Sequence, residues 1–344
     1  FFISGVFYQM IEIKEVKTRK DLKRFITFPY KLYAGNPNWV PPLILDEINT
    51  LSRNKNPAFE YCEARYWMAF KDGKPAGRIA GIINHKFIEK WGKNYARFGW
   101  LDFIDDEEVS KALLGTVESW AREKGLDGVH GPLGFCDLDK QGMLIQGFDE
   151  KSMMITLYNY PYYTVHMEKL GYRKDVDWIE YEIKIPDEIP EKIKKINEFV
   201  LKRMNLNVIR CKSAKELLVY ADEIFNLLNE AYENLYGVVP LTERQKKAYT
   251  KQYLSFINPD YVRVITDENS QLVAFGIAAP SLANAFQKAK GRLLPLGFYH
   301  ILKAMRINDR LELFLIAVKP YLKGKGVNTL LLADINQTAA ANGL

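Results

Sequence analysis

Apolar and polar positions follow two different periods along the chain, and each period predicts a type of element. Residues 67–82 and 262–278 alternate with a period of two around a turn that contains an aspartate, which predicts two β-hairpins. Helical spacing of apolar residues follows Thr18 and Ser213, and an acid lies three residues after each of them, as in a capping box. The sequence therefore predicts an α/β protein.

Residues 310–344 predict a strand, a glycine-rich turn and a helix in succession. The apolar run at 311–318 is closed by Pro320, as a strand often is. The letters KGKG follow at 323–326, and from Val327 onward apolar residues recur on one helical face.

This turn is suited to bind an anion. Gly324 and Gly326 allow backbone N–H groups to turn inward, and the helix start adds unpaired amides and the positive end of its dipole. Lys323 and Lys325 add positive charge. A phosphate or pyrophosphate fits such a turn, but the spacing alone fits a tight turn with solvated lysines equally well.

Three blocks recur in the same order, which predicts a duplicated fold. The pairs are 11–22 with 208–217, 67–82 with 262–278, and 96–126 with 310–344. We expect the first copy to continue with strands at 127–133 and 177–185 and a helix at 161–172. The second copy stops at Leu344, so by the repeat it is expected to be incomplete at its C-terminus.

Composition narrows the class of protein. A chain of 344 residues that is 48% hydrophobic and 26% charged is typical of a soluble protein with two domains. No apolar run reaches the roughly 18 residues of a membrane-spanning helix. Residues 1–9 make a poor signal peptide and are expected to be sequence upstream of Met10. We expect no membrane partner.

Cysteines and charges point to an intracellular protein without metal or nucleic acid. The odd number and wide spacing of the cysteines favour a reducing compartment, by default the cytoplasm, over disulfides or a metal site. They are Cys62, Cys136 and Cys211. The net charge of +6 is spread over helical stretches such as 190–204 rather than gathered with aromatic residues, which argues against nucleic-acid binding.

The turn also resembles a family signature. In the GNAT superfamily of acyl-CoA N-acyltransferases, a bulged strand precedes the pattern Gln/Arg-x-x-Gly-x-Gly/Ala at a helix start. Here it reads Lys323, Gly324, Lys325, Gly326, Val327 and Asn328. Lysine and asparagine replace the first and last family residues. The repeat order matches the same family, so the expected fold is two tandem GNAT-like modules, each a mixed, mostly antiparallel sheet flanked by helices. The expected domains are 10–186, a linker helix at 187–204, and 205–344.

The resemblance implies an N-acyltransferase that moves an acyl group from acetyl-CoA or another acyl-CoA to an amine. The family would hold the pantetheine arm and the thioester on the backbone of the central strand, and the pyrophosphate on the turn. The implied cofactor-binding residues are Ile316, Ala317, Val318, Lys323, Gly324, Lys325, Gly326, Val327 and Asn328.

Glu312 is the candidate general base. It shares the side-chain parity of Phe314 and Ile316 in an otherwise apolar strand, so it would act on the amine directly or through water. The alternative is a glutamate at a strand end that meets solvent. The family's tyrosine acid is expected beyond Leu344, and Met167 stands at its position in the first copy.

The acceptor is expected to be a small amine rather than a basic peptide. The candidate substrate-binding residues are Tyr160, Tyr162, Tyr163 and Arg292. The tyrosine cluster fits core packing as well as cleft lining. The insertion at 281–309 fits a lid and a packing element equally. Residues 29–47 are expected to form an ordered loop.

Only the second module is expected to bind acyl-CoA. The acids at 105–108 stand at the corresponding helix start of the first module and would repel a pyrophosphate. Two other functions remain open. One is a non-catalytic CoA-binding or scaffold protein with a degenerate duplicated fold. The other is a Fem-type aminoacyl transferase, which would use aminoacyl-tRNA and against which the intact KGKG turn argues.

Overall fold

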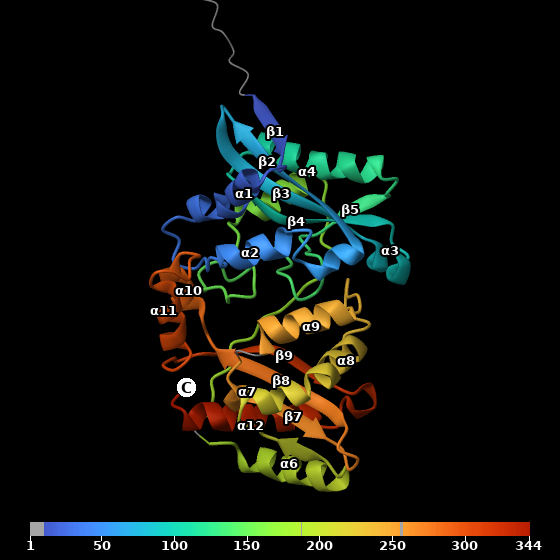
Figure 1. The fold of residues 1–344 in the computed structure, drawn as a ribbon, viewed down its shortest axis with the longest axis vertical. Coiled ribbons are helices and arrows are strands. Elements are labelled where there is room, and N and C mark those ends of the chain that lie inside the picture. The colour runs from blue at the N-terminus through green and yellow to red at the C-terminus, as the bar shows by residue number, and fades with distance from the viewer. Residues whose placement is uncertain (1–9, 187, 255–256) are drawn as a thin grey trace, which may run out of the picture. The chain divides into compact units, whose positions relative to one another are not determined.

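The computed structural model describes residues 10–186, 188–254 and 257–344, so the expectation for residues 1–9 lies outside the described chain. Contacts divide the chain into two units, coloured mostly blue to green and mostly yellow to red in Figure 1. Unit 1 contains residues 1–178 and 286–297, and unit 2 contains 179–285 and 298–344. The middle of the expected insertion at 281–309 therefore groups with unit 1.

Unit 1 is built on a five-stranded sheet of order β1-β2-β3-β4-β5. Its strands are β1 (Ile11–Glu15), β2 (Cys62–Lys71), β3 (Lys74–Asn84), β4 (Tyr95–Phe103) and β5 (Gly128–His130). The first four pair antiparallel and β5 joins β4 in parallel. The pairing of β3 with β4 passes from Arg78↔Asp102 to Ala80↔Gly99, so β4 carries one extra residue and bulges near Trp100, whose φ is 44°.

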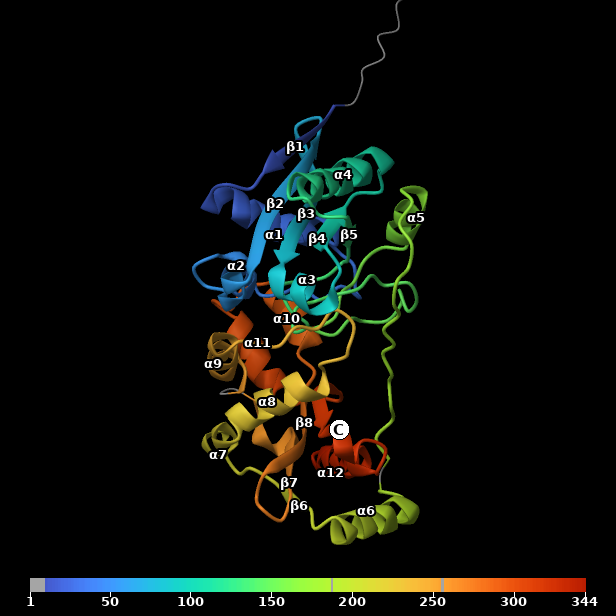
Figure 2. The ribbon, with the colours of Figure 1, turned by 90° about the vertical axis from the view of Figure 1, so that its right-hand side faces the viewer.

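Helices cover both faces of this sheet (Figure 2). They are α1 (Arg19–Leu32), α2 (Ile44–Leu51), α3 (His85–Trp91), α4 (Glu107–Glu123) and α5 (Tyr162–Lys169), and α10 (Ala283–Ala289) straddles the boundary between the two groups. Neighbouring residues of β2 show the two faces, because Tyr66 contacts Phe25 of α1 while Trp67 contacts Trp120 of α4.

Unit 2 repeats the plan with a four-stranded antiparallel sheet of order β6-β7-β8-β9. The strands are β6 (Asn207–Ile209), β7 (Val262–Thr266), β8 (Leu272–Pro280) and β9 (Leu311–Val318). The helices are α6 (Glu191–Arg203), α7 (Ala214–Val219), α8 (Ala221–Ala231), α9 (Glu243–Gln252), α11 (Gly297–Ala304) and α12 (Val327–Ala341). In Figure 2, α8 and α12 lie on opposite sides of β8.

The return-strand glycines of the two hairpins have the same role. A Cβ atom on Gly77 would lie 2.6 Å from Leu113 Cδ1 of α4, and one on Gly276 would lie 3.1 Å from Ile335 Cδ1 of α12. In each unit the helix that follows the central strand thus packs directly on a glycine of the neighbouring strand. This shared contact supports the predicted duplication.

Two local predictions need correction. Residues 177–185 form no strand, and Trp178, Ile179 and Tyr181 are exposed, because the alternating pattern has no strand partner in the described chain. The expected loop at 29–47 contains the end of α1, with Pro29 inside the helix, and the start of α2. By contrast, β5 and α5 confirm the strand expected within 127–133 and the helix expected within 161–172.

Candidate active site

The KGKG turn has the conformation that its glycines predict. Gly324 and Gly326 have φ values of 74° and 86°, in the left-handed region that favours glycine. Gly326 is the N-cap of α12, and no side chain caps this helix. The first amides of a helix have no intrahelical acceptor, so they are available to an anion.

The turn uses one of the amides that the sequence assigned to the anion. The Lys325 N–H donates to the Leu322 carbonyl at 3.3 Å, because a short 3-10 turn (Pro320–Leu322) precedes it. Lys323 Nζ donates to the Ala231 carbonyl at 3.3 Å and so points toward α8. The amides of Gly326, Val327 and Asn328 and the exposed Lys325 side chain remain as the candidate anion-binding groups.

Strand β9 corresponds to the strand that the family resemblance makes central. In the described sheet it lies at the edge and pairs only with β8. Its register passes from Ile277↔Leu315 to Ala278↔Leu313, so Phe314 is an extra residue and β9 bulges there. The bulge lies before Ile316, Ala317 and Val318 rather than within them. Tyr232 Oη donates to the Ile316 carbonyl at 3.1 Å. Because this carbonyl is already engaged, a ligand on the free edge of β9 has to use other backbone groups of the strand.

Glu312 is buried at the start of β9, with 5% of its surface exposed. The Ser281 hydroxyl donates to Glu312 Oε1 at 2.5 Å, and the Ala283 N–H donates to Ser281 Oγ at 3.3 Å. The alternative of a solvent-facing strand-end glutamate is therefore wrong. Its role as the general base stays a prediction.

The tyrosine cluster lies in unit 1 and is mostly structural. Tyr163 is buried in the core, where its hydroxyl lies 2.9 Å from that of Tyr33 and accepts the Phe103 N–H at 3.1 Å. Burial, together with the Asp102 carboxylate, raises the pKa of Tyr163 well above its usual value. A core position explains this residue better than substrate contact.

The other two tyrosines are half-buried and also engaged. Tyr162 Oη donates to the Phe103 carbonyl at 2.5 Å, and Tyr160 Oη donates to the Leu32 carbonyl at 3.3 Å. Arg292 is exposed and groups with unit 1, whereas Glu312 and the turn belong to unit 2. Substrate contact by Tyr160, Tyr162 and Arg292 stays a prediction.

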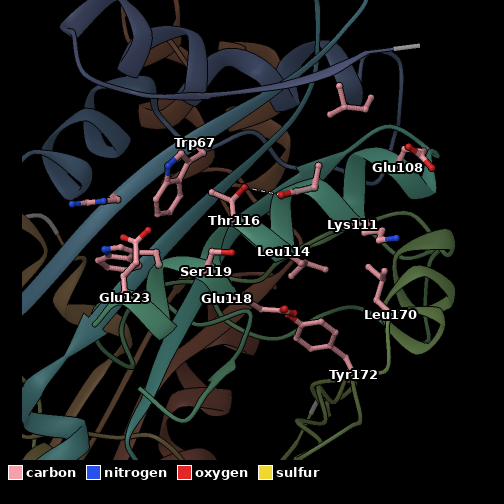
Figure 3. Close-up of a pocket in the computed structure, with 15 residues that line it drawn as sticks. Trp67, Glu108, Lys111, Leu114, Thr116, Glu118, Ser119, Glu123, Leu170 and Tyr172 are labelled. Carbon is pink, nitrogen blue, oxygen red and sulfur yellow. Dashed lines mark hydrogen bonds between the residues drawn. The ribbon is translucent and has the colours of Figure 1, made fainter. Parts of the chain in front are cut away.

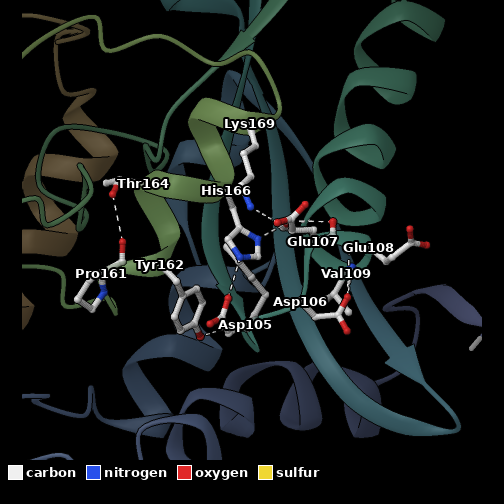
Figure 4. A network of polar contacts seen from close by, with 12 residues as sticks. Asp105, Asp106, Glu107, Glu108, Val109, Pro161, Tyr162, Thr164, His166 and Lys169 are labelled. Atoms are coloured by element: carbon white, nitrogen blue, oxygen red, sulfur yellow. Dashed lines mark hydrogen bonds and ion pairs between the residues drawn. The ribbon is translucent and has the colours of Figure 1, made fainter.

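The equivalent helix start in unit 1 is filled by acids (Figure 4). Asp106 is the N-cap of α4 and accepts the N–H groups of Glu108 at 3.0 Å and Val109 at 3.2 Å. Burial raises the pKa of Asp106, but the hydrogen bonds from Lys71 and these amides outweigh burial and hold it below its usual value. A carboxylate already occupies the place of an anion, which supports an anion site in unit 2 alone.

A buried histidine completes this network. His166 of α5 lies 2.9 Å from Asp105 Oδ1 through Nε2 and 2.8 Å from Ser110 Oγ through Nδ1. Ser110 is fully buried and its hydroxyl donates to the Glu107 carbonyl. The arrangement fastens α5 to the start of α4, and the buried serine is not accessible to a substrate.

A surface hollow of about 790 Å³ lies along α4 in unit 1 (Figure 3). Glu118, Glu123 and Lys111 line it together with Trp67 and Tyr172. It contains none of the residues predicted for catalysis or CoA binding.

Two site residues have no signal in the sequence. Ser281 contacts Glu312, and Tyr232 contacts the Ile316 carbonyl, from segments 31 and 84 residues away. Neither belongs to a motif, and only the fold places them beside β9.

Comparison with known proteins shows which proteins this chain is similar to. No family model matches the sequence. Protein YghO of Escherichia coli K12 is 31% identical over 297 residues, which cover 86% of this chain and 75% of that protein. The bacterial ceramide synthase of Caulobacter vibrioides is 28% identical over 303 residues, covering 86% of this chain and 77% of that enzyme.

A solved structure shares the fold. A tandem GNAT protein from the clavulanic acid biosynthesis pathway is 12% identical and matches 97% of this chain and 87% of its own with a TM-score of 0.50. At this identity the likeness concerns the fold alone. The chain therefore belongs to the same family as Protein YghO and has the tandem GNAT fold.

Proposed function

We propose that the chain is an N-acyltransferase that moves an acyl group from acyl-CoA to an amine. The observation that carries the proposal is the uncapped, glycine-started helix α12 on the same strand-turn-helix as the buried Glu312. Glu312 and Val318 are separated along β9 by about 20 Å at the rise of an extended strand. A ligand with phosphates at the turn must therefore have a long arm to bring its reactive group to Glu312, as CoA does.

The chemistry assigns a role to each group. The amine nitrogen attacks the thioester carbonyl, a C–N bond forms and the C–S bond breaks. Glu312 takes the proton that the amine loses, directly or through water. The amides of Val327 and Asn328 bind the pyrophosphate, and the positive end of the helix dipole favours its charge. The thiolate needs a proton from an acid that we do not assign.

Two kinds of acceptor are supported. The tyrosines and the basic residues of the sequence, Arg292 among them, favour a small amine. The ceramide synthase relative favours a long-chain amino alcohol, because a ceramide is the N-acyl derivative of such an alcohol. The two acceptors share the same reaction at the amine and differ in the apolar chain that the protein has to accommodate.

Binding is tested by titration calorimetry with CoA. Asn328→Asp places a negative charge at the helix start without added bulk, and an acid there stabilises the helix, so lost binding cannot be attributed to unfolding. We expect at least about tenfold weaker CoA binding, because like charges about 4 Å apart near a surface repel by about 4 kcal/mol and a tenfold loss needs only about 1.4 kcal/mol. Gln337→Glu, an exposed site on the same helix, is the matched control. Gly326→Asp should lower affinity further.

Turnover is tested by free-thiol release from acetyl-CoA and long-chain acyl-CoAs with both kinds of amine. Product formation confirms the activity, and the preferred amine identifies the acceptor class. CoA binding without turnover would favour the scaffold alternative. If Asn328→Asp and Gln337→Glu bound CoA equally well, the pyrophosphate would not lie at this turn.

A further inference from the structure

Helix α11 (Gly297–Ala304) is apolar yet almost unburied. Within the described chain, its only buried residue is Gly297. Phe298, Tyr299 and Leu302 are 48%, 55% and 53% exposed. Their spacing of i, i+1 and i+4 puts them within an arc of about 100°, on one side of the helix. A helix in a folded protein normally buries such a face.

The apolar surface continues on both sides of the helix. Leu294 and Leu296, which lead into α11, are 74% and 63% exposed, and Ile307, which follows it, is 72% exposed. Six large apolar side chains within fourteen consecutive residues are therefore exposed. Single exposed apolar residues are common, but a continuous group marks a surface that contacts something else.

Basic residues precede and follow this apolar group along the chain. Between residues 288 and 310 the chain has six basic residues and one acid. The basic residues are Lys288, Lys290, Arg292, Lys303, Arg306 and Arg310, and all are exposed. The acid is Asp309. The charge of this segment therefore selects a partner with negative charge.

We propose that residues 292–307 bind the surface of a bilayer that contains anionic lipid. Aromatic and aliphatic side chains beside lysine and arginine have the composition of helices that lie in a membrane interface. The basic side chains reach the anionic headgroups while the apolar face enters the boundary with the acyl chains. A protein partner with an apolar groove would not account for basic residues on both flanks of the helix.

The binding is peripheral. Within the described part of the chain no helix has the length and apolar character needed to cross a bilayer, and α11 is about 12 Å long by its eight residues. The sequence predicts no membrane partner because it lacks a long apolar run. That absence argues against a helix that crosses a bilayer, and it does not bear on a helix that binds the bilayer surface. The proposal does not depend on acyl transfer, and its test uses no substrate.

The test is cosedimentation with vesicles of phosphatidylcholine alone or mixed with phosphatidylglycerol. We expect wild-type protein to bind the anionic vesicles, more weakly at high salt. The Phe298→Ser, Leu302→Ser double variant should bind at least tenfold more weakly. The Lys303→Glu, Arg306→Glu double variant should lose the preference for phosphatidylglycerol. Val219→Ser, at an exposed valine of α7, is the matched control and should bind as wild type.

A second measurement reports on the position of the helix. The three native cysteines are buried, so an environment-sensitive dye attaches selectively to a cysteine introduced by Leu302→Cys. Its emission should shift to shorter wavelength with anionic vesicles. The same dye on Val219→Cys should not respond.

Two results would overturn the proposal. One is that wild-type protein does not bind anionic vesicles, or that the double variants bind them as wild type does. The other is that the segment joins two copies of the chain, seen as a wild-type dimer that the Phe298→Ser, Leu302→Ser variant converts to a monomer while neither binds vesicles.

Discussion

The carboxylate of Asp334 is expected to stabilise unit 2. Asp334 lies on α12 and pairs with Arg263 of β7, which is 2% exposed, and with Arg210, which follows β6. Arg263 also donates to the carbonyls of Asp260 and Val262, both at 2.8 Å. Asp334→Ala would leave a buried guanidinium without its carboxylate.

The stability that Asp334→Ala should lose follows from the burial of the ion pair. Removing one partner of a buried ion pair lowers the free energy of unfolding by about 3–5 kcal/mol. Because Arg263 keeps its contacts to the two carbonyls, we expect a loss of about 3 kcal/mol. For a module of this size that is a fall in Tm of about 6–12 °C. Arg210→Ala is the control, because Arg210 is largely exposed and its pair with Asp334 is worth less than about 1 kcal/mol.

Thermal and urea unfolding, followed by circular dichroism, measure the stability of both variants. Repeating the measurement across pH separates the contribution of charge from that of packing. Burial raises the pKa of Asp334, but hydrogen bonds from Arg210 and Arg263 outweigh it and hold the pKa below its usual value. A lowered folded-state pKa gives stability that is complete above the unfolded value of about 3.9 and is lost as pH falls through the folded value. The gap between wild type and Asp334→Ala should therefore be constant from pH 5 to 8 and narrow below about pH 4. A loss of less than about 1 kcal/mol at pH 7 would refute the reasoning.

Three further predictions use other parts of the molecule. Glu312→Gln should reduce acyl transfer by about 10²-fold or more while CoA affinity in calorimetry is unchanged; equal rates would remove its role as base. Gly77→Ala should destabilise unit 1 by about 1–3 kcal/mol in urea unfolding, because the new Cβ meets Leu113, whereas Gly115→Ala, with open space around it, should not. Burial raises the pKa of Asp139 to about 6, so its ionisation should lower stability as pH rises from about 4 to about 6. Asp139→Asn should flatten that slope in unfolding measured across this range.

Local signals in the sequence predicted the local structure well. Thr18 and Asp21 form the expected capping box, with the Asp21 N–H donating to Thr18 Oγ1 at 3.1 Å. The KGKG turn takes up the left-handed conformation that only its glycines adopt easily. These features depend on a few neighbouring residues, so the sequence contains all that is needed to predict them.

Features that depend on distant residues were not predictable. Residues 177–185 have the alternation of a strand, but a strand requires a partner edge that the pattern does not specify. Gln287 groups with unit 1 because its amide donates to the Pro37 and Trp39 carbonyls, about 250 residues away. Tyr163 lies in the core because Tyr33 and Phe103 surround it, and neither is near it in sequence.

The two modules differ in the charges at one helix start. In unit 1 the helix after the central strand begins at Asp106, whose carboxylate accepts two of the first amides and fills the positive end of the dipole. In unit 2 the corresponding helix begins at Gly326, which has no side chain to accept them and whose φ of 86° turns the backbone into position. Asp106→Gly alone should not create an anion site in unit 1, because Asp105, Glu107 and Glu108 would still repel the anion. If CoA binds as proposed, the duplicated fold keeps one copy for packing and one for binding, because the charges at the turn of each strand-turn-helix decide whether a phosphate is repelled or attracted.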